Sequence, residues 1–422
     1  MISILLCHRR AIWHILGSLM LLSPSVTASI QAQTAPAPTT RDLARAERIL
    51  RGTPLIDGHN DLPWRIREDT IARGNVDAYD IRKHTPGHTD LERLKRGMVG
   101  AQFWSVYTPG EYRDSGYARV QLEQIDIARR VIAKYPDRFA LALTANDIRR
   151  DFKQGKLACL IGLEGGHAIE NSLGVLRAYY DLGVRYMTLT HNVTLDWADA
   201  ALDSAKHGGL TPFGDSVVRE MNRLGMLVDL SHVSPGTMSD ALNVTQAPVI
   251  FSHSGARALV DVARNVPDSI LRRVTTNGGI VMVPFVTGFV SPAVLLYDQS
   301  SRPVMKDLRE KYGTDTAAIT REIKQWTATH PAPRATLSQV ADQIEYVRKV
   351  AGVDHVGIGG DFDGITEVVQ GLEDVSTYPA LFAELARRGW SDADLRKLAG
   401  ENLLRVFGRA ERVAARLRGA KP

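Results

Sequence analysis

The stretch ACLIGLEGGH, residues 158–167, leads from a continuous apolar segment into a glutamate, two glycines and a histidine. An apolar run without polar alternation is typical of a strand that is buried on both faces of a parallel sheet. The acid and the imidazole follow at the point where such a strand would end. The stretch therefore predicts a parallel sheet with polar side chains at the carboxyl end of one strand.

The same arrangement recurs along the chain, where short apolar runs alternate with longer amphipathic segments and no second linker interrupts them. Eight runs are present, which is the number that a (β/α)8 TIM barrel requires. We therefore expect an α/β fold with one barrel domain over residues 46–415. The eight runs are Pro54–Gly58, Val99–Val106, Ala158–Leu163, Arg185–Thr190, Met226–Leu230, Pro248–Phe251, Gly279–Val283 and His355–Gly359.

Capping residues mark two of the helices expected between these runs. Thr211 predicts the cap of a helix over 212–224, which Gly225 ends. Ser338 predicts the cap of another helix, which Gly352 ends before the eighth run.

The stretch 291–336, between the seventh and eighth runs, is unusually long for a barrel connection. We expect it to be an elaborated loop over the barrel mouth, with one helix near 315–329.

Side chains of the metal-binding type follow six of the eight runs. The carboxyl ends of barrel strands form one face, and active sites are built there. His59 and Asp61 are two residues apart, so an extended backbone directs both to the same side. The side chains at these strand ends are His59, Asp61, Glu164, His167, His191, His232, His253, Asp361 and Asp363.

Each of these residues alone has an ordinary structural explanation. A single histidine after a strand is more often a hydrogen-bonded core residue, and Asp361 could cap a helix or belong to a weak imitation of a calcium loop. The glycines at 357–360 resemble a phosphate-binding turn only weakly. Their joint occurrence at successive strand ends favours a common site, whereas His167 and Asp363 are interpreted as structural.

Three histidines and several carboxylates, with no thiolate nearby, suit zinc and tolerate manganese or cobalt. Two ions fit better than one, because five ligands and a water exceed one tetrahedral shell. A glutamate can bridge two ions about 3.5–4 Å apart. The pattern therefore predicts two Zn²⁺ per chain.

On these motifs the sequence resembles the membrane (renal-type) dipeptidase family, a branch of the metal-dependent amidohydrolases, from about Arg51 to Gly408. The resemblance implies a barrel of the metal-dependent hydrolase type that cleaves dipeptides with a metal-activated hydroxide. The matching motifs are IDGHNDLPW (56–64), ACLIGLEGGHAIE (158–170), RYMTLTHN (185–192) with WAD (197–199), LVDLSHVS (227–234), PVIFSHS (248–254), RNVPD (264–268), GIGGDFDG (357–364) and ENLLRVF (401–407).

The resemblance also implies a ligand set. His59 and Asp61 would hold one zinc, His232 and His253 would hold the other, and Glu164 would bridge the two as part of the catalytic centre.

Three further roles follow from the resemblance. His191 would contact the substrate and polarise its carbonyl, and Arg264 would pair with the terminal carboxylate of the substrate, although by itself this arginine suggests only a surface salt bridge. Asp361 would act on the metal-bound water and transfer its proton. Pro284 and Phe289 depart from the asparagine and tyrosine of mammalian relatives, which leaves the substrate pocket open to question.

Family members cleave dipeptides, often with a D-residue at the C-terminal side, and are commonly homodimers. The alternatives are an N-acyl-amino-acid deacylase, a lactonase or a β-lactam hydrolase on the same binuclear site. A more remote alternative is a non-catalytic metal-binding protein. In such a protein we would expect a metal ligand or Asp361 to be replaced, but all of these residues are present.

The N-terminus predicts export. Residues 1–10 carry two arginines and no acid, residues 11–22 are mostly apolar, and small residues precede a cleavage point after Ala28 or, less favourably, Ala32. An uncleaved anchor is the alternative, but the apolar run is short for a bilayer. We expect a signal peptide at 1–28, a periplasmic or secreted enzyme and no stable membrane insertion after cleavage.

Composition excludes some other possibilities. The 422-residue chain has a formal net charge of +5, which falls to +3 once Arg9 and Arg10 leave with the signal peptide. This small and scattered excess gives no reason to expect a nucleic-acid partner. Cys7 also leaves, so Cys159 alone remains and cannot form an intramolecular disulfide. We expect a flexible spacer over 29–45 and a basic tail over 416–422.

Overall fold

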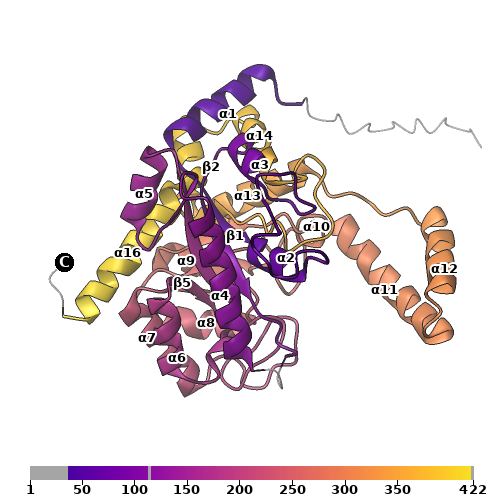
Figure 1. Cartoon of the computed structure of the whole chain (residues 1–422), viewed down its shortest axis with the longest axis horizontal. Helices are drawn as coiled ribbons and strands as arrows, with labels where there is room; N and C mark the ends of the chain where they lie inside the picture. Colours follow the sequence, from indigo (N-terminus) through magenta and orange to yellow (C-terminus); the bar gives the residue numbers. More distant parts are fainter. Residues whose placement is uncertain (1–36, 113–115, 420–422) are drawn as a thin grey trace, which may run out of the picture. The chain divides into compact units, whose positions relative to one another are not determined.

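A closed parallel barrel forms the centre of the chain in the computed structural model, which describes residues 37–112 and 116–419 (Figure 1). Each barrel strand pairs in parallel with its neighbours, and closure comes from β1 pairing with β9 and from β2 pairing with β4. The eight predicted strands are confirmed. They are β1 (Leu55–Asn60), β2 (Val99–Tyr107), β4 (Leu157–Glu164), β5 (Val184–Thr188), β6 (Leu227–Asp229), β7 (Ile250–Phe251), β8 (Ile280–Val283) and β9 (Val356–Ile358).

A ninth strand, β3 (Phe139–Leu141), was not predicted. It pairs with the first residues of β4, whereas β5 pairs with the later residues 161–164 of the same strand. Since β2 pairs along the whole of β4 from Ala158 onward, β3 and β5 share the other edge of that strand. Three residues are too few to give a recognisable apolar run.

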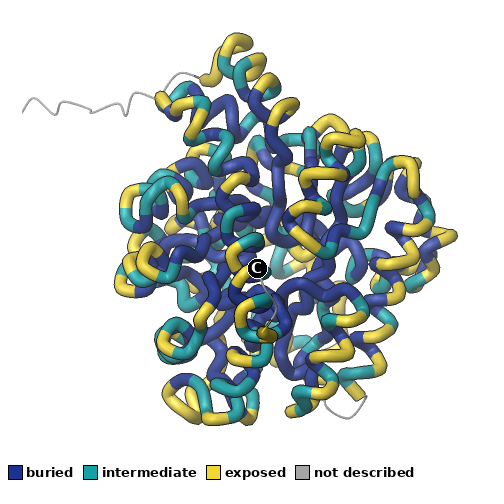
Figure 2. The backbone as a smooth tube through the Cα atoms, turned by 90° about the vertical axis from the view of Figure 1, so that its left-hand side faces the viewer, coloured by how far each residue is buried: buried dark blue, intermediate teal, exposed yellow. Residues whose placement is uncertain are grey.

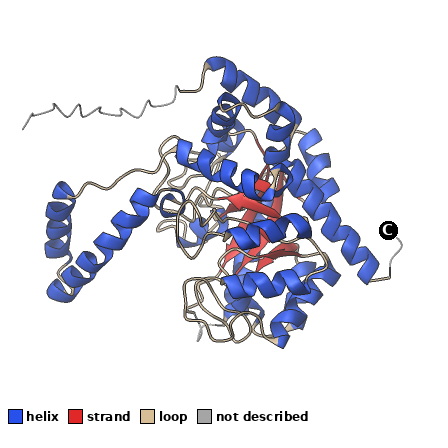
Figure 3. Ribbon diagram, turned by 180° about the vertical axis from the view of Figure 1, so that it is seen from behind, coloured by secondary structure: helices blue, strands red, loops and turns tan. Residues whose placement is uncertain are grey.

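Helices surround the strands on the outside (Figure 3). The α-helices are α1 (Thr40–Gly52), α2 (Leu62–Glu68), α3 (Leu91–Arg96), α4 (Tyr117–Lys134), α5 (Ala145–Lys153), α6 (Leu173–Asp181), α7 (Pro212–Leu224), α8 (Pro235–Val244), α9 (Asp268–Asn277), α10 (Thr287–Val290), α11 (Pro292–Tyr312), α12 (Thr316–Thr329), α13 (Leu337–Ala351), α14 (Tyr378–Arg387), α15 (Asp392–Arg396) and α16 (Asn402–Leu417). Among the described residues, 3₁₀ turns cover Gly166–Ile169, Val353–His355 and Val375–Thr377, and a π-helical turn covers Lys397–Glu401.

The caps of α7 agree with the prediction, whereas α13 begins differently. Thr211 accepts a hydrogen bond from the third residue of α7, and Gly225 ends this helix with φ of 88°, a left-handed conformation that favours glycine. In α13 the cap is Thr336, whose capping box includes Gln339, so Ser338 is inside the helix and its predicted capping role is wrong. Gly352 ends α13 as expected.

The expected spacer at 29–45 is too long at its C-terminal end, because α1 begins at Thr40. A capping box joins Thr39 and Asp42, with bonds of 2.9 and 3.2 Å between their backbone and side chains. Buried Ile49 and Leu50 then fix the helix to the domain. The predicted signal peptide and the spacer up to residue 36 lie outside the described residues.

The stretch 291–336 is largely helical, so the expectation of an elaborated loop over the barrel mouth is wrong, whereas the helix expected near 315–329 is confirmed as α12. Ser291 caps the 21-residue α11, which α12 follows and contacts, with the Tyr297 and Trp326 rings 5.6 Å apart. Val294 is the one buried residue of α11, so the helix packs little of its surface against the rest of the domain. Residues 291–336 do not line the pocket at the barrel mouth, and in Figure 1 the two helices extend to one side of the barrel.

Alternate strand residues fill the interior of the barrel. Ile56, Phe103, Leu160 and Met282 belong to one buried cluster, while their strand neighbours pack outward against the helices. Figure 2 shows this concentration of buried backbone at the centre. The apolar filling of the interior leaves the strand ends as the place where the titratable side chains of the pocket gather. Cys159 is buried with a free thiol, and among the described helices we find none with the length and apolarity needed to cross a membrane.

Candidate metal centre and active site

The structure brings the predicted site residues together at the carboxyl ends of the strands. They line a pocket of about 340 Å³, except His59, which is fully buried beneath it. The predicted residues that line the pocket are Asp61, Glu164, His191, His232, His253, Arg264 and Asp361.

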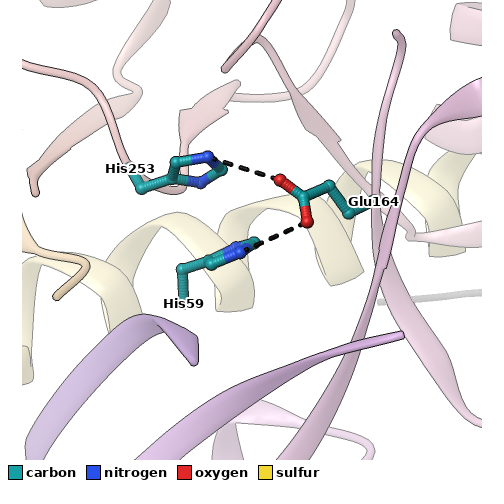
Figure 4. Close-up of side chains that lie close together, drawn as sticks. All are labelled: His59, Glu164 and His253. Carbon is teal, nitrogen blue, oxygen red and sulfur yellow. Dashed lines mark ion pairs between the residues drawn. The ribbon is translucent and has the colours of Figure 1, made fainter. Parts of the chain in front are cut away.

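Glu164, the last residue of β4, lies at the centre of the group (Figure 4). Its Oε2 is 3.5 Å from Nε2 of His59, whereas its Oε1 is 3.0 Å from Nε2 of His232 and 3.4 Å from Nε2 of His253. The two carboxylate oxygens therefore face different imidazoles, which is the arrangement of a bridging carboxylate.

Two aspartates complete the side of the cluster that contains His59. Asp61 Oδ2 is 3.2 Å and Asp361 Oδ1 is 3.8 Å from Nε2 of this histidine. Backbone hydrogen bonds hold them there, because the N–H of Asp361 donates to the carbonyl of His59 and the N–H of Asp61 donates to that of Phe362. Donor atoms within 4.8 Å of one another form three overlapping groups: His59, Asp61 and Asp361; His59, Glu164 and His253; and Glu164, His191 and His232.

A polar partner on Nδ1 orients each of the three central imidazoles, so that Nε2 points into the cluster. Such outer partners fix the tautomer and ring position of metal-ligating histidines. Ser252 donates its own hydroxyl proton to Asp229 at 2.6 Å, so it accepts from His253. The three pairs are His59 with the Tyr186 hydroxyl at 2.8 Å, His232 with the Asn192 side-chain oxygen at 3.1 Å, and His253 with the Ser252 hydroxyl at 2.9 Å.

The Nε2 atoms of this cluster fit a bound metal. Burial holds the pKa values of His232 and His253 well below their usual range, so both rings are neutral, yet their Nε2 atoms are only 2.8 Å apart. With Nδ1 as the protonated nitrogen, two lone pairs face each other and repel unless a cation lies between them. Buried His59 Nε2 likewise has no hydrogen bond of good geometry, although Asp61 lies near. Imidazoles and carboxylates without thiolates suit zinc.

Two of the site residues adopt backbone conformations that side chains rarely tolerate. His232 has φ of 67° and Asp361 has φ of 63°, both in the left-handed region. Strain of this kind, about 1–3 kcal/mol per residue, persists only where the surroundings hold the residue in place. Asp363, with φ of 68°, accepts a 2.6 Å hydrogen bond from the backbone N–H of His88. This bond connects the two loops that contain these residues.

The glycines before Asp361 serve close packing. A Cβ on Gly359 would lie 1.8 Å from the carbonyl oxygen of Ser252, so only glycine lets β9 approach the end of β7 this closely. The next residue, Gly360, donates its N–H to the buried carboxylate of Asp57 at 2.8 Å. Asp57 also accepts from Tyr378 and Gln102. Sequence analysis assigned no role to Asp57, although it belongs to the IDGHNDLPW motif.

Burial raises the pKa of Asp361 well above its usual range; His59 opposes this shift, while Asp61 and Glu164 reinforce it. The side chain of Asp361 is 14 % exposed and faces the pocket. A carboxyl group with a raised pKa beside an opening can both take and return a proton.

His191 follows β5 and lies at the edge of the cluster, with Nε2 3.9 Å from Glu164 Oε1. Its ring packs against Tyr107 at 4.7 Å and His232 at 4.3 Å between centroids. Burial lowers the pKa of His191 to about 4, so the ring is neutral at pH 7 and its N–H is available as an uncharged donor.

Arg264 is a buried cation without an anionic partner. It is 2 % exposed, and its one hydrogen bond runs from Nη2 to the carbonyl of His253 at 3.4 Å. Nη1 is buried without any partner, and no carboxylate of a described residue lies within ion-pair distance of the guanidinium. Burial lowers the pKa of Arg264 to about 10, so it remains charged at neutral pH. The pocket therefore presents an unpaired positive charge.

Of the apolar residues that line the pocket, sequence analysis singled out only Phe289. Phe289 contacts Arg264, with 5.3 Å between the guanidinium carbon and the ring centroid, so this departure from mammalian relatives does concern the pocket. Pro284 is buried and does not line it. Leu202, Val286 and Ile365 lie in loops and carry no motif that would identify them in advance, whereas Trp64 belongs to the IDGHNDLPW motif. The apolar or aromatic lining residues are Trp64, Tyr107, Leu202, Val286, Phe289 and Ile365.

Comparison with known proteins agrees with this site. Residues 43–421 match the family model described as membrane dipeptidase (peptidase family M19). The chain is 42% identical over 390 residues to Dipeptidase 3 of Rattus norvegicus and to that of Mus musculus, covering 91% of this chain and 70% of each relative. The crystal structure of the probable dipeptidase PvdM from Pseudomonas aeruginosa superposes with a TM-score of 0.76 at 26% identity, covering 89% of this chain and 99% of the other.

Proposed function

Because the chain belongs to the membrane dipeptidase family, peptidase family M19, and is therefore a metallopeptidase, we propose that it hydrolyses dipeptides with bound zinc. The observation that carries this proposal is the buried, unpaired guanidinium of Arg264 in the same pocket as the imidazole–carboxylate cluster. A pocket of about 340 Å³ with a fixed cation suits a short substrate that has a free carboxylate close to the scissile bond.

We propose two zinc ions per chain. His59 and Asp61 would hold one, His232 and His253 would hold the other, and Glu164 would serve both through its two oxygens. This division is supported by the carboxylate of Glu164, whose Oε2 faces His59 while its Oε1 faces His232 and His253. When bound, the ions supply electrophilic polarisation of the carbonyl and a water acidified toward neutral pH.

The protein side chains would bind and orient the substrate and move its protons. The planar fork of Arg264 would take the substrate carboxylate through two parallel hydrogen bonds. The neutral His191 N–H would donate to the carbonyl oxygen as negative charge develops there; losing such a donor typically costs about 2.7–4 kcal/mol of transition-state stabilisation. Asp361 would accept the proton of the attacking water and deliver it to the leaving amine nitrogen.

A substrate panel tests this function. Purified protein is assayed with L,L and L,D dipeptides, N-acyl amino acids, lactones and a β-lactam, before and after chelation, with zinc counted per chain by elemental analysis. We expect dipeptides to be the best substrates, including some with a C-terminal D-residue, and two zinc ions to restore activity. Faster turnover of acyl amino acids, lactones or the β-lactam would identify a different hydrolase on the same site.

We also propose that the enzyme is exported to the periplasm or secreted, and that it forms a homodimer. The basic and apolar composition of residues 1–28 supports export, and the family resemblance supports the dimer. Intact mass of the protein recovered outside the cytoplasm would locate the cleavage after Ala28 or Ala32. Light scattering on the eluting protein would give the oligomeric state.

A further inference from the structure

A second cavity, of about 250 Å³, lies at the amino ends of the strands, on the face opposite to the metal cluster. Val99 lines it at the start of β2, while Tyr107 at the end of the same strand lines the active-site pocket. A nine-residue strand separates the two by roughly 26 Å. The lining residues are Leu50, Arg51, Leu91, Leu94, Lys95, Met98, Val99, Gly100, Arg138, Phe139, Phe152, Gly155, Lys156 and Leu157.

Much of this lining is apolar and comes from separate elements. Leu50 of α1, Leu94 of α3 and Phe139 of β3 are buried, and Phe152 of α5 is half-buried. The volume is that of a small organic group rather than of one water molecule. The cavity therefore offers apolar contacts that water satisfies poorly.

The charged side chains that line the cavity are all cations. Arg51 has a partner, since it lies 3.5 Å from Glu47 of its own helix. Around Lys95, Arg138 and Lys156, by contrast, no carboxylate in the described part of the chain lies within 4 Å. Because no acid lines the cavity, its positive potential is not neutralised locally.

We propose that this cavity binds a small amphiphilic anion, with a hydrocarbon body against the apolar wall and a carboxylate or similar head beside Lys95, Arg138 and Lys156. A neutral apolar ligand would leave three cations uncompensated, and an inorganic anion would leave the apolar wall in water. A volume of about 250 Å³ accommodates a small organic molecule, whereas a stable protein interface spreads over a surface of about 800 Å² on each partner. The site is separate from the peptidase centre.

Calorimetric titration with octanoate, below its micelle concentration, tests the proposal on the full-length, metal-loaded protein. Octylamine and octanol have the same chain with a cationic or neutral head. We expect saturable binding of octanoate, with octylamine and octanol at least about tenfold weaker because they lose the charge-assisted contact. Equal binding of the three compounds would overturn the proposal.

Charge reversal locates the site. Lys156→Glu and Arg138→Glu should each weaken octanoate about tenfold, whereas Lys153→Glu, an exposed lysine of α5 that does not line the cavity, should leave the dissociation constant unchanged. Leu91→Trp should weaken binding by filling the space. All four variants should retain dipeptide turnover, which serves as the test of folding.

Two further results would also contradict the proposal. Loss of octanoate binding in Arg264→Ala, or competition by a dipeptide, would place the anion in the active-site pocket. Association with vesicles of anionic phospholipid, without binding of monomeric octanoate, would indicate a membrane surface instead. A negative titration leaves the peptidase assignment intact, because that rests on a different face of the barrel.

Discussion

The hydroxyl of Tyr186 lies 2.8 Å from Nδ1 of His59, inside the barrel and beneath the metal-ligand cluster. Tyr186 is fully buried and packs against Phe103, with ring centroids 4.9 Å apart. The ring is thus fixed by packing, and the hydroxyl in turn fixes the orientation of the imidazole. A residue in the middle of β5 therefore orients a metal ligand near the end of β1, although these two strands do not pair with each other.

Tyr186→Phe should weaken zinc binding while preserving the fold. The ring and its packing remain, but the hydrogen bond that orients His59 is lost, and loss of such a partner typically costs about 10–100-fold in metal affinity or activity. Competition with a coloured chelator measures the affinity. Tyr346→Phe, which removes a hydroxyl bonded to Asp268 away from the site, is the matched control. Equal zinc affinity in both variants would show that Tyr186 has no orienting role.

Asp361→Asn should keep both zinc ions and lose most turnover. The amide has nearly the same shape as the carboxyl group but cannot carry the proton from water to the leaving amine, a step worth about 10²–10⁴-fold. Zinc per chain and kcat are measured together. Normal kcat would remove Asp361 from proton transfer, and loss of zinc would make it a ligand instead.

Arg264→Ala should raise KM for free dipeptides by about 10–100-fold, the range expected for losing a charged hydrogen-bonded pair. The sharper measurement compares each dipeptide with its C-terminal amide. The wild-type enzyme should prefer the free acid, and the variant should lose this preference because its pocket no longer presents the cation. A preference that survives the substitution would assign carboxylate recognition elsewhere.

Asp57→Asn should destabilise the domain by at least about 2 kcal/mol. The carboxylate accepts hydrogen bonds from Gln102, Gly360 and Tyr378, whereas the amide NH₂ of asparagine would face one or more of these donors without being able to accept from them. Urea unfolding measures this change. Asp392→Asn weakens two partly exposed ion pairs, with Arg45 and Arg48, and should cost less than about 1 kcal/mol for each. A similar effect of both substitutions would mean that the buried network around Asp57 contributes little.

The strands and the residues at their ends were predictable because burial on both faces leaves continuous apolar runs. Glu164 follows such a run directly and His253 follows another after Ser252, and parallel strands bring their carboxyl ends together whatever the order of pairing. Strand β3 was missed because its three residues are too few to form a recognisable apolar run. Helix α11 was missed because it buries almost nothing and contains Pro303.

The partners of the ligands were not predictable in the same way. Tyr186 and Asn192 reach the imidazoles of His59 and His232 only through the register and curvature of the barrel, whereas Ser252 directly precedes His253 in the sequence. Their residue types are ordinary for their positions. The unpaired state of Arg264 is also a tertiary property, since its sequence neighbours include Asp268, which pairs with Tyr346 instead.

The filled interior of the barrel makes the active site a dead end. Ile56, Phe103, Leu160 and Met282 leave no passage from the pocket to the far mouth. Both amino acids released from one dipeptide must therefore depart through the opening by which it arrived. A product that dissociates slowly blocks the binding of the next substrate. The architecture therefore favours small substrates whose two products leave quickly.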